Sequence, residues 1–313
     1  MELKSRGAIL NVIEILSSQY LQGKVRAIRL ALVSLLSGGH LLLEDIPGLG
    51  KTSLALALSR VLGLSFGRIQ CTSDLLPSDI TGLSIFDRKE NSFRFIKGPI
   101  FNHLILVDEV NRAMPKTQSA LLEAMEERRV TLEGVTYQLP DPFLVIATQN
   151  PVEQVGTYPL PDSQLDRFMA TTGLGYPPAE LERNIIQGGS VREELEKIEA
   201  CLTLDEIKSA RQSVREDIYL SEKIAGYIHD LALRSRTHPM VLSGLSTRGC
   251  LSLAGAARAV AYLEGRDFVV PEDVQQVAVP VCSHRLILRP ENESLLKEEV
   301  FQSLMVEIPV PLV

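Results

Sequence analysis

Short apolar runs alternate with helical segments through the first half of the chain. The runs cover residues 40–43, 66–70, 104–107, 143–148 and 171–174. They are rich in leucine and β-branched residues and are not polar at alternate positions, which is the pattern of strands that are buried on both faces. We therefore expect an α/β fold in which a parallel five-stranded sheet lies between helices.

Helical periodicity surrounds these runs. Apolar residues at three- and four-residue spacing predict one helix over residues 2–20, a second over 25–36 and a third over 115–128. Residues 130–139 have the pattern of a hairpin with its turn at Gly134.

Almost every segment beyond Tyr176-Pro177-Pro178 has helical periodicity, so we place a domain boundary near residue 178. Helix starts are indicated by the capping box Thr203–Glu206, by Ser246 as an N-cap and by Pro271 at a first helical position. The predicted parts are an N-terminal helix over 1–22, an α/β domain over 23–178, and a linker with an α-helical domain over 179–313.

Composition narrows the class of protein further. A chain of 313 residues with 45% hydrophobic and 23% charged residues can form about two packed domains, which excludes a disordered polymer. The net charge of −7 offers no global attraction for nucleic acid or an anionic membrane, although a local basic groove is not excluded. Four scattered cysteines and the lack of a membrane-spanning apolar stretch predict a cytoplasmic protein without membrane insertion.

The sharpest local motif is a glycine-containing loop between an apolar run and an apolar helix. Gly48 and Gly50 free the backbone to wrap a phosphate chain, and the following helix N-terminus favours anions. Lys51 supplies a charge for the β- and γ-phosphates, and the hydroxyl of Thr52 suits Mg²⁺. The predicted nucleotide-binding residues are Asp45, Ile46, Pro47, Gly48, Leu49, Gly50, Lys51, Thr52 and Ser53.

This loop departs from the usual G-x-x-x-x-G-K-[ST] pattern, because Asp45 stands where the first glycine is expected. Two outcomes are open from the sequence. The carboxylate of Asp45 could weaken nucleotide binding by lying near the phosphates, or it could cap the loop from outside.

Polar side chains follow two of the predicted strands. Asp108 and Glu109 end the run 104–107, and the carboxyl ends of parallel strands meet beside the phosphate loop. There Asp108 would hold Mg²⁺ and Glu109 would orient and partly deprotonate the attacking water. Asn150 could hold this water or the γ-phosphate, although an Asn-Pro pair is also a common turn.

Two arginines, Arg167 and Arg248, are candidates for stabilising the charge that develops on a transferring phosphoryl group. Taken alone, each is better explained as a surface salt-bridge partner. A wider sequence pattern is needed to choose between these interpretations.

That pattern is present, because the sequence resembles the MoxR family of AAA+ ATPases over about residues 20–288. The stretches that carry the resemblance are LLEDIPGLGKT (42–52), DLLPSDITG (74–82), GPIFNHLILVDEVNRAMPKTQSALLEAMEE (98–127), FLVIATQNPVEQVGTYPLPDSQLDRF (143–168) and GLSTRGCLSLAGAARAVAYLEGRDFVVPEDV (244–274). The resemblance implies an AAA+ P-loop NTPase domain followed by an all-α lid. It also implies the helix-2-insert branch, with the insert within about residues 74–96 and a hairpin before sensor 1 at about 130–139.

The resemblance also implies roles for single residues. Asn150 resembles sensor 1, and Arg167 resembles the arginine finger that acts on ATP bound by the neighbouring subunit. Arg248 resembles sensor 2 and would reach the γ-phosphate of its own subunit, although Thr247 stands where the family more often has proline. Gln70 could hold Glu109 away from ATP until a client binds, or it could be a strand-end amide with no such role.

The resemblance implies a ring, with a hexamer as the family precedent, that binds ATP and Mg²⁺ and remodels or activates a client enzyme. It also implies a partner protein with a von Willebrand factor A domain. Other readings are a magnesium-chelatase-like or DNA-remodelling motor, an ATP-gated scaffold with little turnover, and a small-molecule kinase. The acidic balance disfavours the DNA motor, the intact Glu109 and Arg167 disfavour the scaffold, and no acceptor site supports the kinase.

Overall fold

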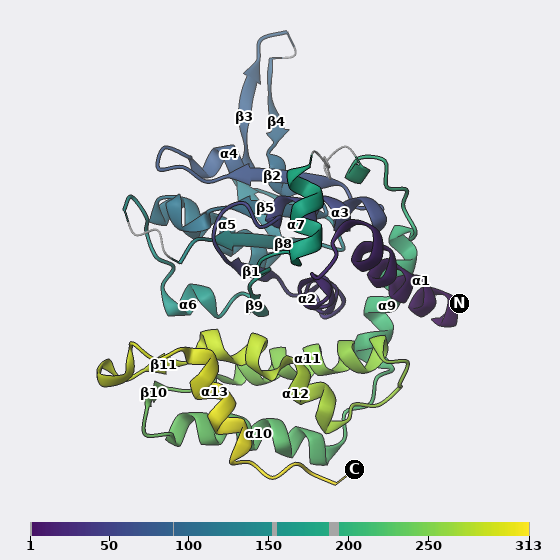
Figure 1. The fold of residues 1–313 in the computed structure, drawn as a ribbon. Coiled ribbons are helices and arrows are strands. Elements are labelled where there is room, and N and C mark those ends of the chain that lie inside the picture. Colours follow the sequence, from purple (N-terminus) through teal and green to yellow (C-terminus); the bar gives the residue numbers. More distant parts are fainter. Residues whose placement is uncertain (1, 90, 152–154, 188–193, 313) are drawn as a thin grey trace.

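A computed structural model describes residues 2–89, 91–151, 155–187 and 194–312. Figure 1 shows an α/β unit above a layer of lid helices. The α/β unit contains a parallel five-stranded sheet in the order β2-β5-β8-β1-β9, as the apolar runs predict. Its strands are β1 (Leu41–Glu44), β2 (Phe66–Gln70), β5 (Leu104–Asp108), β8 (Leu144–Gln149) and β9 (Ala170–Thr172).

Alternate residues of the central strand β5 face two different hydrophobic clusters, whereas the prediction of burial on both faces is wrong for the edge strand β2, whose Arg68 and Gln70 are exposed. Leu104 and Leu106 of β5 pack on the face covered by α2 (Val25–Leu36) and α3 (Lys51–Val61). Ile105 and Val107 pack on the opposite face, which α5 (Pro115–Glu127) covers. Burial on both faces explains why polar residues are absent at alternate positions of this strand.

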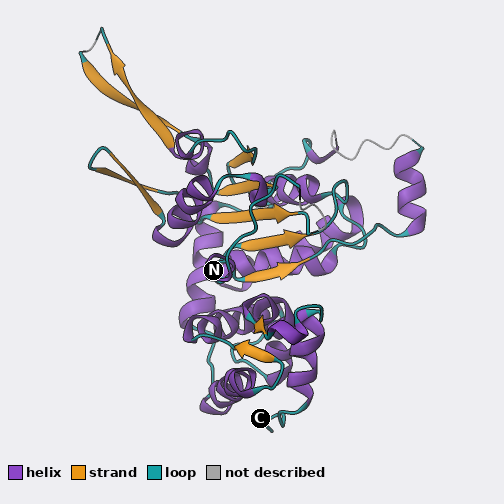
Figure 2. Cartoon of the chain, turned by 90° about the vertical axis from the view of Figure 1, so that its left-hand side faces the viewer, coloured by secondary structure: helices purple, strands orange, loops and turns teal. Residues whose placement is uncertain are grey.

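Two β-ribbons extend from the same side of the α/β unit (Figure 2). Where the sequence predicts the insert, the structure has α4 (Pro77–Thr81) and the ribbon of β3 (Gly82–Asp87) with β4 (Ser92–Lys97). The second ribbon pairs β6 (Arg129–Leu132) with β7 (Val135–Gln138) and turns at Glu133 and Gly134, which both have positive φ. The rings of Phe95 and Tyr137 stack 4.2 Å apart and join the two ribbons.

The N-terminal helical segment differs in detail from the prediction of one α-helix over residues 2–20. The α-helix α1 ends at Ile15, and Leu16–Tyr20 form a π-helical turn. Arg6 of α1 lies over the Tyr262 ring of the lid, with 4.5 Å between its guanidinium carbon and the ring centroid. The segment therefore packs against the lid as well as leading into α2.

The second part of the chain is helical, with one short two-stranded addition that the sequence pattern did not indicate. Ser246 caps α11 by accepting a hydrogen bond from the Gly249 amide, as predicted. The short helix α6 (Asp162–Leu165) precedes β9, and α7 (Ala179–Ile186) follows it. The lid elements are α9 (Leu204–Glu216), α10 (Glu222–Thr237), α11 (Thr247–Leu263), α12 (Pro271–Cys282), α13 (Lys297–Val306), β10 (Val241–Ser243) and β11 (Ile287–Leu288).

Two observations concern the cysteines and the membrane. All four cysteines are free thiols, as their spacing predicts. Among the described residues, every helix is too short or too polar to cross a bilayer.

The ring of His40 links the sheet to α5 and is fully buried. Its Nδ1 accepts a hydrogen bond from the Val145 amide at 3.0 Å, and its Nε2 lies 3.2 Å from the Met125 carbonyl, to which it donates. Burial and the nearby Arg128 guanidinium lower the pKa of His40 from 6.5 to about 3. A neutral ring is therefore part of the folded state.

We predict an acid-sensitive fold, because the unfolded chain takes up a proton at His40 before the folded chain does. The stability that the neutral ring contributes is intact above pH 6.5 and is lost as the pH falls towards 3. The free energy of unfolding should fall by about 2 kcal/mol between pH 7.5 and pH 5 through this group alone. Urea unfolding should show a shallower pH dependence for His40→Gln, whose amide keeps a donor and an acceptor. The exposed His229→Gln is the control, and parallel losses in wild type and His40→Gln would contradict the assignment.

Candidate nucleotide-binding site

A cavity of about 310 Å³ lies at the carboxyl edge of the sheet, where the loop between β1 and α3 meets the ends of β5 and β8. Gly48 and Gly50 have φ of 87° and 94°, and the space around both is open. Their backbone conformation, rather than crowding, therefore requires glycine. The lining residues are Pro47, Gly48, Gly50, Lys51, Thr52, Ser53, Arg68, Gln70, Asp108, Glu109, Thr148 and Asn150.

Lys51 begins α3, and its ammonium is held over the loop. The Nζ atom donates a hydrogen bond to the Asp45 carbonyl, so the side chain folds back along the loop. Burial lowers the pKa of Lys51, while the carboxylates of Asp45, Asp108 and Glu109 raise it. The cation therefore shares its cavity with the acids Asp108 and Glu109.

The carboxylate of Asp45 caps the loop from outside. Its Oδ2 accepts hydrogen bonds from the amides of Leu174 at 2.7 Å and Gly175 at 2.8 Å, and its Oδ1 accepts one from Ile46 at 3.0 Å. Lys24 donates to the Leu174 and Gly175 carbonyls and holds the same segment from its other side. Of the two outcomes that the sequence left open, the structure has the second.

Asp108 ends β5 and is bound by an arginine that the sequence analysis missed. Arg68 of β2 donates from Nε to Asp108 Oδ2 at 2.8 Å, and its Nη2 lies 2.7 Å from the same oxygen. Thr148 of β8, also missed, donates to Asp108 Oδ1 at 3.4 Å. The arginine in the middle of the run 66–70 was itself the available signal, because a charged residue there departs from the pattern of a strand that is buried on both faces.

Glu109 follows Asp108 in the left-handed region, with φ of 55°. Its amide donates to Thr148 Oγ1 at 2.9 Å, which fixes the turn against β8. Gln70 Nε2 donates to Glu109 Oε2 at 3.3 Å, and Arg112 Nε lies 3.1 Å from the same oxygen. The predicted proximity of Gln70 and Glu109 is thus present, and this carboxylate is already engaged by two neighbours.

Asn150 directly follows β8 and lines the cavity beside Thr148. Thr52 lines it from the first turn of α3. The hydroxyl of Thr52 and the carboxylate of Asp108 are the oxygen donors that Mg²⁺ prefers. Within the described ranges, no group of three His, Cys, Asp or Glu side chains gathers around a common point. This donor set fits an ion that keeps waters and binds phosphate oxygens.

Arg167 and Arg248 lie together, at the opposite edge of the sheet. Both contact Glu126 near the end of α5: Arg167 Nε lies 3.3 Å from Oε2, and Arg248 Nη2 donates to Oε1 at 2.6 Å. These three side chains line a second cavity of about 270 Å³ together with His40, which precedes β1. The phosphate loop follows β1, whose four residues span about 13 Å.

Arg248 does not line the phosphate-loop cavity of its own subunit in this structure, and its predicted role stays a prediction. The resemblance predicted that Arg248 reaches the γ-phosphate of its own subunit, but the lid holds it beside Arg167 on the amino edge of the sheet. Its place depends on how the lid packs under the α/β unit, which no local motif encodes. Glu126, which joins the two arginines, was missed because it looks like an ordinary charged residue of an exposed helix face.

Comparisons with known proteins agree with this architecture. Residues 40–170 match the ATPase family associated with various cellular activities (AAA), and residues 233–304 match the AAA lid domain. A crystal structure from Cytophaga hutchinsonii, provisionally described as an ATPase, has a TM-score of 0.90 at 36% identity. The match covers 99% of this chain and 97% of that one. The fold and the matched regions define an AAA-type ATPase with a lid.

Similar proteins of known sequence identify the family within the AAA-type ATPases. The chain is 40% identical to chaperone MoxR1 of Mycobacterium tuberculosis over 275 residues, which cover 85% of this chain and 72% of MoxR1. It is 31% identical to MoxR of Paracoccus denitrificans over 92% of both chains. The uncharacterized protein YeaC of Bacillus subtilis is 44% identical over 90% of this chain and 88% of its own length. The chain belongs to the MoxR family of AAA+ ATPases.

We predict that Asp45→Ala destabilises the phosphate loop and does not improve ATP binding. Removal of the carboxylate leaves three amides without their acceptor, which costs about 1–3 kcal/mol. Urea unfolding should show this loss, and titration with a fluorescent ATP analogue should show weaker binding. Asp45→Asn, which keeps one acceptor oxygen, should lie between wild type and Asp45→Ala. Tighter ATP binding by Asp45→Ala at unchanged stability would mean that this carboxylate repels the phosphates.

Proposed function

We propose that this protein hydrolyses Mg·ATP as a homo-oligomeric ring, with a hexamer as the expected form. One observation carries the proposal: the phosphate loop and the two arginines occupy opposite edges of one sheet. One subunit therefore keeps Arg167 and Arg248 away from its own phosphate loop, while the arginine edge of a neighbour can supply them. Repetition of such a head-to-tail contact closes a ring when the rotation permits.

In this proposal the carboxyl-edge cavity holds ATP through the loop from Asp45 to Ser53. Backbone amides and Lys51 bind the phosphates, and Glu109 orients and deprotonates the attacking water. Asn150 positions the water or the γ-phosphate. When bound through Thr52 and Asp108, Mg²⁺ would neutralise developing charge on the phosphate oxygens. Arg68 must then release at least part of its contact with Asp108.

The arginine edge acts on the ATP of the neighbouring subunit. Glu126 holds Arg167 and Arg248 as a pair and compensates their charge while no phosphate is near. A γ-phosphate carries more negative charge than this carboxylate, so it competes effectively for both guanidinium groups. Hydrolysis removes that shared anchor and allows the two subunits to reorient.

The work of the ring is proposed by analogy with relatives. MoxR1 is named a chaperone, which supports remodelling or activation of a client enzyme. The ribbon of β3 and β4 is suited to contact a client, since Phe86 and Phe93 are exposed there. A von Willebrand factor A domain protein is the partner that we propose, and four free thiols fit a reducing cytoplasm.

A second candidate is an ATP-gated scaffold with little turnover. The contacts of Gln70 and Arg112 with Glu109 Oε2 favour it, because they restrict how this carboxylate can turn towards an attacking water. The rate of phosphate release by the wild-type protein distinguishes the two candidates.

Substitution of Glu109 by glutamine should separate binding from hydrolysis. Glu109→Gln keeps the size and polarity of the side chain but cannot accept a proton, so ATP should bind while phosphate release falls by about 10²–10⁴-fold. Lys51→Ala should lose ATP binding itself and is the matched control. A fluorescent ATP titration and a phosphate-release assay measure the two effects. Unchanged turnover of Glu109→Gln would assign the base to another residue.

Mixed rings should show whether the arginines act between subunits. Arg167→Ala subunits retain the phosphate loop, and Lys51→Ala subunits retain the arginine edge, so mixing two inactive proteins should restore part of the ATPase rate. Arg248→Ala should behave like Arg167→Ala, because both arginines share Glu126. Mass spectrometry should verify that mixed rings form. Their inactivity would indicate that each subunit completes its own site.

A further inference from the structure

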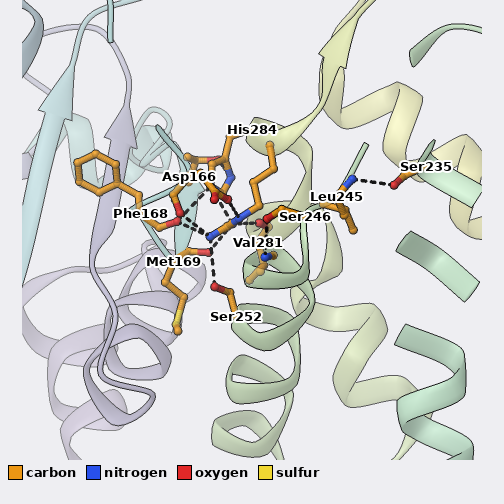
Figure 3. Close-up of polar contacts among 12 residues, drawn as sticks. Asp166, Phe168, Met169, Ser235, Leu245, Ser246, Ser252, Val281 and His284 are labelled. Atoms are coloured by element: carbon orange, nitrogen blue, oxygen red, sulfur yellow. Dashed lines mark hydrogen bonds and ion pairs between the residues drawn. The ribbon is translucent and has the colours of Figure 1, made fainter. Parts of the chain in front are cut away.

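A buried arginine of the lid holds the segment that carries Arg167. Arg285 ends the short turn after α12, and its side chain is 2% exposed. Nε donates to Asp166 Oδ1 at 2.7 Å, Nη2 donates to the Phe168 carbonyl at 2.7 Å, and Nη1 donates to the Met169 carbonyl at 3.1 Å. Figure 3 shows these carbonyl and carboxylate groups facing the lid. The guanidinium therefore binds residues on both sides of Arg167.

The same guanidinium also contacts the helix that carries Arg248. Nη2 donates to Ser252 Oγ of α11 at 3.3 Å. A Cβ atom at Gly249 would lie 3.1 Å from Arg285 Cδ, so the first turn of α11 packs directly on this side chain. Arg285 thus lies between the backbone of Arg167 and the backbone of Arg248, whose side chains meet at Glu126.

The chemistry of this position requires an arginine. A buried cation is tolerated only when its donors are satisfied, and here one carboxylate and several carbonyls accept from a planar fork. His284 Nε2 lies 2.8 Å from Nη1 and accepts from it, which fits the lowered pKa that burial gives this histidine. A lysine would carry the charge, but its single nitrogen could not satisfy the acceptors that Nε, Nη1 and Nη2 of Arg285 bind.

We propose that Arg285 is a positioning residue that fixes Arg167 and Arg248 relative to each other, so that the lid presents both guanidinium groups to the neighbouring subunit's ATP. This inference rests on the proposed ring ATPase. It assigns Arg285 to the arginine edge of the subunit, although it contacts neither nucleotide nor Glu126. Movement of the lid would change the placement of the finger, because Arg285 binds residues on both sides of Arg167.

The first test separates turnover from ATP affinity. Arg285→Lys should lower kcat for ATP hydrolysis by about a hundredfold, the usual cost of displacing a catalytic group by about 1 Å. Affinity for ATP should stay within about twofold, because the phosphate loop lies on the other edge of the sheet. The matched control is Arg266→Lys, since Arg266 binds Asp273 within the lid. Equal losses in both variants would overturn the proposal.

The decisive test is complementation in mixed rings. Arg285→Lys mixed with Lys51→Ala should regain activity, because one subunit supplies an intact loop and the other an intact arginine edge. Arg285→Lys mixed with Arg167→Ala should stay inactive, since both lesions damage the same edge. If Arg167→Ala with Lys51→Ala regains activity but Arg285→Lys with Lys51→Ala does not, the role of Arg285 is contradicted and the intersubunit site is retained. If neither pair regains activity, the proposed intersubunit site itself is contradicted.

Loss of folding is controlled with a milder variant. Asp166→Asn keeps the carbonyl acceptors and removes only the charge that faces Arg285. It should show the same complementation pattern as Arg285→Lys, with a smaller loss of kcat. Thermal unfolding of each protein reports its stability. Normal kcat in a folded Asp166→Asn and a folded Arg285→Lys would overturn the proposal.

Discussion

The direction of the chain in a parallel sheet is the constraint on which the rest of the molecule depends. All five strands end at one edge, and the groups that suit phosphate and metal collect there because loops at that edge follow strands. The segments that precede β1 and β9 lie at the other edge, and there the structure gathers Arg167, Arg248 and Glu126. The polarity of the sheet therefore separates the two halves of the phosphoryl-transfer site that we propose.

Each half is held by hydrogen bonds between residues far apart in the chain. Asp45 fastens the phosphate loop to the segment after β9, and Arg285 fastens the segment before β9 to the lid. The short strand β9 thus lies between the segment that Asp45 binds and the segment that Arg285 binds, one at each edge of the sheet. Because buried donors and acceptors without partners cost free energy, each anchor restricts its segment to one arrangement.

The sequence predicted what local patterns encode. Apolar runs located all five strands to within two residues at each end, and the spacing of Gly48, Gly50 and Lys51 identified the loop, because strand burial and phosphate binding both act through neighbouring residues. The roles that we give the site residues remain proposals. Packing between distant segments determines the partners of Asp45, the position of Arg248 and the contact of Arg68 with Asp108. The periodicity of apolar residues carries no information about such packing. The π-helical turn after Ile15 was likewise invisible to an apolar pattern that suits either helix.

The stacked rings of Phe95 and Tyr137 have a mechanical consequence. Phe95 also meets Phe101 edge to face, with 5.6 Å between the ring centroids, and Phe101 precedes the strand that ends in Asp108. These ring contacts couple the two ribbons to each other and to the segment that leads into the strand with the acids. If the ribbons hold a client, as we propose, a load on either one would be transmitted towards the nucleotide-binding edge.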